Sequence, residues 1–459
     1  MILKDLKQYS KYFTEYTELR VQENRNIRIT MVNGDIMSNS RTAVGGISAR
    51  VYKDGFWGFA SNPELDEERI RKVIESATKN AIFLSSKEKR KKTELPNRIA
   101  NSENDFTTTK PKKSQKEMIE FMQKIDEYIK EKFTKLTSRT VVVACLDMEK
   151  SLLTSDGSTS YSMIPRTISY VTMTVEKDGQ PYELYEVYGG FGQFEDNFED
   201  PKELFPKLDE QYEHLIKKSE GVYAETGVHD CILDADLAGI LAHEAIGHTT
   251  EADIVKGGSV AGDFLNQKVA SEMVTLVDFA NHYDGKLCPV PLFIDDEGTK
   301  GEDAVIIENG VLKKYMNNKE YADHFNMELT GNARAYGFYD EPLVRMRNTA
   351  ILPGKSKLED MIASIENGYY LMKSSNGQAD STSEFMFGIV QGYEIKNGKL
   401  GKAIKDTTIN GVAFDVLKTV TMVSDDMVWG CGGMCGKKQL IPVGMGGPAV
   451  KCKINIGGK

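Results

Sequence analysis

The 459-residue sequence lacks the features that mark several broad classes of protein. It contains no run of about 18 apolar residues, the length that a membrane-spanning helix needs. Its first ten residues contain no apolar segment like that of a signal peptide. The 58 Lys and Arg residues are outnumbered by 68 Asp and Glu residues, so the formal net charge is −10. A negative balance argues against general affinity for nucleic acid or anionic membranes, and we expect neither partner.

Cysteine is scarce as well, with six residues at positions 145, 231, 288, 431, 435 and 452. So few cysteines in so long a chain do not make a disulfide framework, and they fit a reducing compartment. The sequence also shows no period of the kind that marks solenoids or propellers. We therefore expect a cytoplasmic protein built from non-repetitive domains.

The length exceeds what one hydrophobic core usually spans, so two domains are expected. In residues 1–222, the spacing of apolar residues predicts helices near 3–13, 63–77, 113–133 and 201–218. Alternating segments and Asn-Gly or Asp-Gly turns predict strands at 27–31, 47–59, 140–146, 150–154, 168–177 and 183–190. The Lys-rich run 87–92 is expected to be a solvated loop. We expect this half to be a scaffold that serves dimerisation or covers a site.

Residues 223–459 have a different pattern, in which short apolar segments are broken by turn pairs such as Asp284-Gly285, Asn309-Gly310 and Asn397-Gly398. Short strands with frequent turns are typical of a sandwich or barrel-like architecture. A strand is expected at 228–233, and a helix is expected at about 356–367. The predicted fold class is α+β, with an N-terminal α+β domain, 1–222, followed by a β-rich C-terminal domain, 223–459.

The most distinctive chemical motif opens the second half, where His243 and Glu244 are adjacent and His248 follows. In the related motif His-Glu-x-x-His, which is one residue shorter, both histidines lie on one helix face and bind zinc, and the Glu is a general base. At a spacing of five, the imidazoles of a regular α-helix would point about 140° apart. We therefore predict that the helix bulges or ends near Gly247, which is expected to permit the change.

The residues around this motif are apolar, including Leu237, Leu241 and Ile246, so the segment is expected to be buried. Buried histidine and glutamate side chains need polar partners. A purely structural hydrogen-bond cluster would provide such partners. We favour a metal site on the helix that contains this motif, because a metal site also accounts for a glutamate beside a histidine.

A catalytic zinc ion commonly has three protein ligands, so one ligand remains to be found. Residues 429–448 form a glycine-rich stretch that contains Cys431 and Cys435. Glu251 follows His248 by three residues and is a further candidate, with Asp253 close behind it. The spacing alone does not distinguish Cys435, Cys431 and Glu251 as the third ligand.

Several motifs, spread over nearly the whole chain, resemble those of the TldD/PmbA metalloproteases, once described as modulators of DNA gyrase. They lie at 54–60, 243–248, 345–349, 433–437 and 442–444. The resemblance implies that His243, His248 and Cys435 bind Zn²⁺ and that Glu244 is the general base. Typical members with this motif continue Gly-Leu-Glu-Gly-Asp after the second histidine. This chain departs from that pattern but keeps Glu251 and Asp253, which are expected to support the site.

The resemblance also implies a chain of two domains that dimerises around a chamber, either with itself or with a partner that lacks the motif. It implies a zinc-dependent metalloprotease that cleaves unfolded peptides or leader peptides. The backbone of Gly432, Gly433, Met434 and Gly436 is expected to bind the extended substrate.

Two other functions are considered, a non-catalytic regulator that binds DNA gyrase or another protein, and a zinc hydrolase of small amides. The net charge of −10 disfavours direct DNA binding by a regulator. A non-catalytic protein would also have no need of Glu244 beside a metal ligand.

Overall fold

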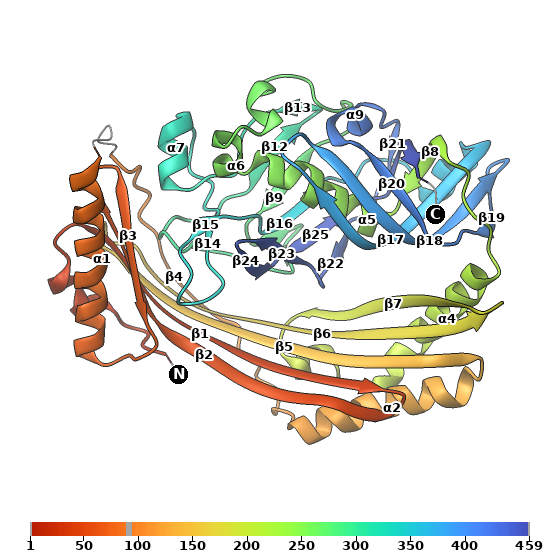
Figure 1. Ribbon diagram of the computed structural model, residues 1–459, viewed down its shortest axis with the longest axis horizontal. Helices are drawn as coiled ribbons and strands as arrows, with labels where there is room; N and C mark the ends of the chain where they lie inside the picture. Colours follow the sequence, from red (N-terminus) through yellow and green to blue (C-terminus); the bar gives the residue numbers. More distant parts are fainter. Residues whose placement is uncertain (1, 89–93, 458–459) are drawn as a thin grey trace.

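The computed structural model describes residues 2–88 and 94–457. Its N-terminal half is a long, curved sheet with strands in the order β3-β2-β1-β5-β6, and β4 and β7 both pair with β6 (Figure 1). The strands are β1 (Tyr16–Val32), β2 (Asp35–Lys53), β3 (Phe56–Asn62), β4 (Asn101–Asp105), β5 (Leu136–Thr154), β6 (Thr159–Lys177) and β7 (Gln180–Phe191). The helices are α1 (Glu67–Lys87), α2 (Gln115–Lys132), α3 (Phe194–Asn197) and α4 (Phe205–Ser219).

Helix α2 packs on the face of this sheet that points away from the C-terminal half (Figure 1). Helix α4 packs on β6 and β7, and it also contacts the C-terminal half, where His214 hydrogen-bonds to Tyr393. The capping box of Ser114 and Glu117 begins α2, and its apolar stripe, which includes Met122 and Ile125, is fully buried against the sheet. Helix α1 lies on β2 and β3, where Gly58 permits the close approach. A Cβ atom at Gly58 would lie 2.2 Å from the carbonyl oxygen of Ala77.

The C-terminal half is richer in strands. Five strands, β17-β8-β26-β20-β18, form a sheet that closes through the pairing of β17 with β18, so the predicted barrel-like architecture is confirmed. This sheet contains β8 (Gly227–Leu233), β17 (Asn367–Ala379), β18 (Glu384–Lys396), β20 (Thr407–Val412) and β26 (Val450–Ile456). In addition, β19 (Lys399–Ala403) pairs with β18, and β21 (Met422–Val423) pairs with β26.

A six-stranded mixed sheet lies beside it, with the order β13-β12-β9-β16-β25-β22. Its strands are β9 (Leu276–Phe279), β12 (Ala304–Glu308), β13 (Val311–Leu312), β16 (Asn348–Ile351), β22 (Val428–Gly430) and β25 (Gly444–Gly447). Three short hairpins are β10 (His282–Tyr283) with β11 (Lys286–Leu287), β14 (Ala333–Arg334) with β15 (Leu343–Val344), and β23 (Met434–Lys437) with β24 (Gln439–Pro442). The helices are α5 (Ala235–Ile240), α6 (Ala252–Lys256), α7 (Lys319–Phe325), α8 (Leu358–Ala363) and α9 (Ala413–Lys418).

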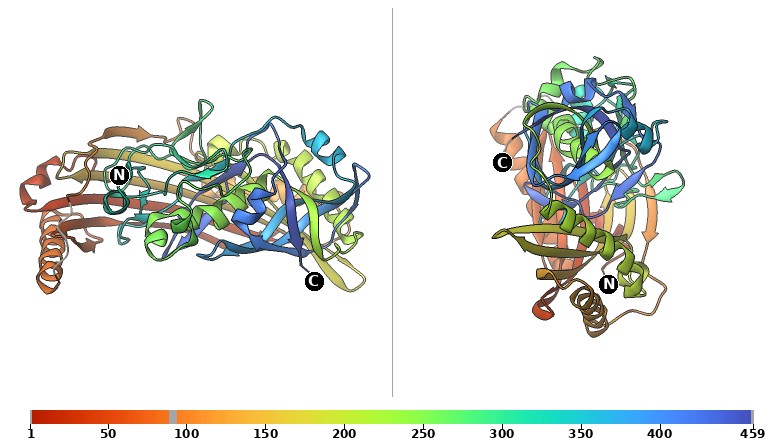
Figure 2. Two further views of the ribbon diagram at one scale, coloured as in Figure 1. Left: turned by 90° about the horizontal axis from the view of Figure 1, so that it is seen from above. Right: turned by 90° about the vertical axis from the view of Figure 1, so that its right-hand side faces the viewer.

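The C-terminal half lies on the concave face of the N-terminal sheet (Figures 1 and 2). Buried charged groups join the two halves. Lys150 of β5 donates to Asp296 at 2.7 Å, and Arg20 of β1 donates to the carbonyl oxygen of Gly337 at 3.1 Å. Arg166 of β6 donates to the carbonyl oxygen of Gly433 at 3.0 Å. The N-terminal sheet therefore contacts the glycine-rich stretch directly.

Several predicted elements have different lengths in the structure. The strands predicted at 140–146 and 150–154 are one strand, β5, because it pairs with β1 and β6 over almost its whole length. The helix predicted near 3–13 is a 3₁₀ turn, Lys7–Tyr12, and the helix predicted at 356–367 is limited to α8. Strand β4 was not predicted. Residues 89–92 of the predicted Lys-rich loop lie outside the described residues.

Candidate metal centre

The motif helix changes its winding at the histidines. It begins as α5, capped by Asp234, whose side chain accepts the backbone N–H of Leu237 at 2.8 Å. From Leu241 to Gly247 the winding is π-helical, and the backbone N–H of His248 donates to the carbonyl oxygen of His243, five residues earlier. The extra residue per turn turns both imidazoles toward one side, with ring centroids 5.3 Å apart. The predicted bulge is confirmed.

The role of Gly247 differs from the prediction. Its backbone has ordinary helical angles, φ −56° and ψ −55°, so no unusual conformation calls for glycine. Glycine is needed because a Cβ atom there would lie 2.0 Å from Sδ of Met346, which is completely buried. Close packing against Met346 therefore explains the glycine.

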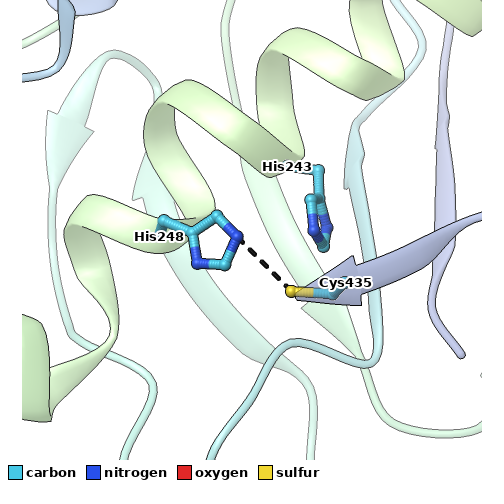
Figure 3. Close-up of side chains that lie close together, drawn as sticks. All are labelled: His243, His248 and Cys435. Carbon is cyan, nitrogen blue, oxygen red and sulfur yellow. Dashed lines mark hydrogen bonds between the residues drawn. The ribbon is translucent and has the colours of Figure 1, made fainter. Parts of the chain in front are cut away.

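Cys435 of β23 lies opposite the two histidines (Figure 3). Its Sγ atom is 3.4 Å from Nε2 of His248, and ligand atoms of His243, His248 and Cys435 all lie within 4.8 Å of one another. Among residues 2–88 and 94–457, this is the one group of three or more His, Cys, Asp or Glu side chains close enough to share a metal ion. The structure thus brings together residues from two distant parts of the chain.

The donor set of this group fits zinc. His243 is 1% exposed, yet neither of its ring nitrogens has a hydrogen-bond partner among the described residues. A buried imidazole without partners is costly, and a metal ion would satisfy one nitrogen. In a tetrahedral zinc site with ordinary bond lengths, nitrogen and sulfur ligands lie about 3.5 Å apart. The separation of His248 and Cys435 is close to that value.

The charges around His248 alternate. Burial raises the pKa of the Cys435 thiol, but the neighbouring imidazoles outweigh it and lower the pKa to about 5. Burial lowers the pKa of His248, but Cys435 and Glu251 raise it to about 10. Cys435 is therefore favoured as the thiolate, the form that binds metals. The raised pKa of His248 favours a positive charge at this imidazole. A bound metal cation would supply that charge in place of the proton.

Glu251 lies behind His248. It is fully buried, and its Oε2 atom is 2.9 Å from Nδ1 of His248 and 3.1 Å from Nζ of Lys437. Burial raises the pKa of Glu251, but Lys437 and His248 lower it to about 2. Lys437 also donates to Asp253 at 2.8 Å. The structure thus places Glu251 and Asp253 where they orient His248 and Lys437, outside the group of three.

Glu244 lies beside the cluster. Its Oε2 atom is 3.8 Å from Nε2 of His248, and its side chain is 27% exposed. A carboxylate that is partly open to solvent can accept a proton from a water molecule bound near the cluster.

Cys431 points elsewhere. Its Sγ atom donates to the carbonyl oxygen of Gly189 in β7, 2.8 Å away, and burial raises the pKa of its thiol. It lies outside the group of three.

The glycine-rich stretch is partly engaged within the protein. The carbonyl oxygen of Gly433 accepts hydrogen bonds from Arg166 and from the backbone N–H of Val443. Met434 and Gly436 are exposed, and a Cβ atom at Gly436 would meet nothing within 4 Å. Gly432 is partly buried at the edge of a cleft.

One positioning residue was not found from the sequence. Arg345 is completely buried and donates to the carbonyl oxygen of Cys435 at 2.7 Å and to that of Gln439 at 2.9 Å. It therefore fixes the strand that carries Cys435. The sequence signal was the pair of arginines in motif 345–349, but nothing in the spacing connects them with β23.

The comparisons with known proteins agree with one another. The family model described as PmbA/TldA metallopeptidase C-terminal domain matches residues 226–458, and the model of metallopeptidase domain 1 matches residues 17–81. A metalloprotease of Methanocaldococcus jannaschii is 34% identical over 95% of this chain and 96% of its own length. A zinc metalloprotease TldD homolog of Saccharolobus solfataricus is 34% identical over 53% of this chain and 55% of its own length.

Solved structures show the same fold. TldE of Thermococcus kodakarensis has a TM-score of 0.75 at 18% identity, with 98% of each chain covered. A chain of Thermotoga maritima described as a modulator of a DNA gyrase has a TM-score of 0.77 at 20% identity, covering 96% of this chain and 95% of its own. No described helix is both long and apolar enough to cross a membrane. From its motifs, its sequence matches and its fold, the chain belongs to the TldD/PmbA family of metallopeptidases.

Proposed function

We propose that the chain is a zinc-dependent metalloprotease that hydrolyses peptide bonds of unfolded peptides or leader peptides. His243, His248 and Cys435 would hold the ion. The main support is that one ligand atom of each of these side chains lies within 4.8 Å of the other two. Zinc bound there would supply Lewis acidity, which polarises the scissile carbonyl and makes a nearby water more acidic.

Glu244 is proposed as the general base. Its carboxylate takes the proton of the attacking water and passes it to the leaving amine. Glu251 holds Nδ1 of His248, which leaves Nε2 free to face Cys435 and the ion. Arg345 holds the backbone of Cys435, so the thiolate does not depend on a flexible loop.

The substrate is proposed to lie along the exposed part of residues 432–436. Met434 and Gly436 are exposed and Gly432 is partly exposed, so they offer an accessible surface with few side chains. The carbonyl oxygen of Gly433 already accepts hydrogen bonds from Arg166 and Val443. Gly433 would therefore contribute its N–H group and the space left by its missing side chain. Contacts to backbone groups do not depend on sequence, which suits an enzyme for unfolded chains.

A dimer is proposed as the working form, either of this chain or with a family member that lacks the motif. The support is the close structural similarity to TldE, at a TM-score of 0.75. The proposed division of labour gives residues 223–459 the metal centre and residues 1–222 the dimer contacts and a cover over the site.

A peptide digest tests the function. Zinc-loaded protein should cleave long unstructured peptides, and a chelator should stop it. Cleavage of small amides without cleavage of such peptides would favour a small-molecule hydrolase. Metal-free protein that cleaves nothing but binds a folded protein would favour a regulator.

A further inference from the structure

A cleft of about 520 Å³ opens between the two halves of the chain, beside the metal centre. One wall is formed by residues of β6, β7 and α4. The other is formed by residues of α5 and its N-cap, of β17, β18, β22 and β25, and by residues 431–433. Ile240, about one turn before Glu244, and Gly433, two residues before Cys435, both line it. Two strand residues span about 7 Å, so a side chain of a peptide held at the centre can reach the cleft.

The lining of the cleft is acidic. It has four carboxylates, Glu186, Glu210, Asp234 and Asp236, against two lysines, Lys207 and Lys373. Lys373 is already paired with Glu186, to which it donates at 2.5 Å. Burial lowers the pKa of the cleft's histidine, His214, and so disfavours a positive charge on it.

Two of these carboxylates, Asp234 and Asp236, form no ion pair with any residue that the structure describes. Asp234 accepts the backbone N–H of Leu237 through Oδ1. Asp236 accepts no hydrogen bond from any described residue, and burial raises its pKa more than the charge of Lys373 lowers it. Both side chains are partly buried, and burial raises the pKa of each carboxyl. A positive group that enters the cleft would therefore stabilise both ionised carboxylates.

Aromatic rings complete the lining. Tyr170, Tyr185, Tyr188 and Trp429 all contribute to it. The hydroxyls of Tyr185 and Tyr188 are engaged within the protein, with Ser374 and Gln211. Aromatic faces next to carboxylates attract alkylammonium and guanidinium groups, which combine apolar stems with positive charge.

We propose that this cleft is a specificity subsite that binds the side chain of a lysine or arginine near the scissile bond, with Asp236 as its main partner. This inference rests on the proposed peptidase function and adds a preference that the sequence-independent backbone contacts do not provide.

The first test uses the unmodified protein with zinc. Peptides with acetylated N-termini and amidated C-termini carry Lys, Arg, norleucine or Glu at each of the three positions on either side of one cleavable bond. At one position, kcat/KM for Lys and Arg should exceed that for norleucine about tenfold, through KM, and Glu should be poorest. Equal values at every position would overturn the proposal while leaving the peptidase function intact.

The second test uses Asp236→Asn. The ratio of kcat/KM for the Lys peptide to that for the norleucine peptide should fall about tenfold. Asp415→Asn removes the same charge on α9, outside the cleft, and should keep the ratio of the unmodified protein. An unchanged ratio in Asp236→Asn contradicts the assignment. If this variant does not fold, the peptide series on the unmodified protein still decides.

A binding measurement tests the cleft independently of the proposed peptidase function. Calorimetry of the same peptides with the Glu244→Gln protein needs no turnover and should show the same preference for Lys and Arg. If no peptide is cleaved by the unmodified protein, the peptidase function fails, and this calorimetry still tests the cleft. A preference confined to peptides with a free N-terminus would mean that the cleft takes the α-ammonium group, contrary to the proposal.

Discussion

Sγ of Cys435 lies 3.4 Å from Nε2 of His248, although 187 residues separate the two in the chain. Beside this pair lies the buried His243, whose ring nitrogens have no hydrogen-bond partner within residues 2–88 and 94–457. A single ion at this place would bind one atom of each of the three side chains and link β23 to the motif helix.

The protein should bind about one zinc ion per chain, and loss of zinc should destabilise it. Thermal unfolding with and without a chelator measures this, and the melting temperature should fall when zinc is removed. Cys435→Ala is the matched control, since its melting temperature should not respond to chelator. An absence of zinc from protein never exposed to chelator would contradict the site.

Cys435→Ala should lose zinc and peptide cleavage, whereas Cys431→Ser should keep both. The reason is that Cys435 faces the histidines, while Cys431 donates to Gly189. Elemental analysis of both purified variants measures the metal. Equal zinc loss in both variants would show that the third ligand is misassigned.

Glu244→Gln keeps the shape of the side chain but cannot accept a proton. Peptide cleavage should fall by about 10²–10⁴-fold with zinc still bound. Steady-state kinetics on one peptide, with zinc content measured in parallel, checks both parts. Turnover within a few-fold of the unmodified enzyme would remove Glu244 from the role of base.

Glu251→Gln should weaken zinc binding by about 10–100-fold, because the carboxylate orients His248 and balances its charge. Competition with a chromogenic chelator gives the affinity. Asp253→Asn is a suitable comparison, since Asp253 contacts Lys437 and not His248, and its effect should be smaller. Affinity unchanged in Glu251→Gln would mean that His248 is held by packing alone.

Gly247→Ala should destabilise the protein by about 1–3 kcal/mol, because the new methyl group would overlap Met346. Denaturant unfolding measures the change. Met346→Ala makes room, so the double variant should recover part of the loss relative to the sum of the single changes. Additive effects would show that the glycine serves another purpose.

Helix starts and tight turns could largely be predicted from the sequence, because they depend on residues that are neighbours in the chain. Ser114 and Glu117 cap α2, and Asp54-Gly55 joins β2 to β3, since capping and turn geometry depend on a few neighbouring residues. The lengths of the strands could not be predicted as well. Strand β5 continues through 147–149 because β1 and β6 pair with it there, and no local pattern reveals such partners.

The sequence by itself determined that two histidines and a glutamate share one buried helix. Their spacing of five required a departure from α-helical winding, because the geometry of a helix is a property of the chain alone. Residue spacing did not distinguish Cys435 from Cys431 and Glu251, and only the tertiary structure shows Cys435 beside both histidines. The position of Cys435 depends on the hydrogen bond from Arg345 to β23, and the position of Glu251 depends on its contact with Lys437. These contacts, like that of Cys435 with His248, join residues about 90 to 190 positions apart, so the packing of the whole domain determines them.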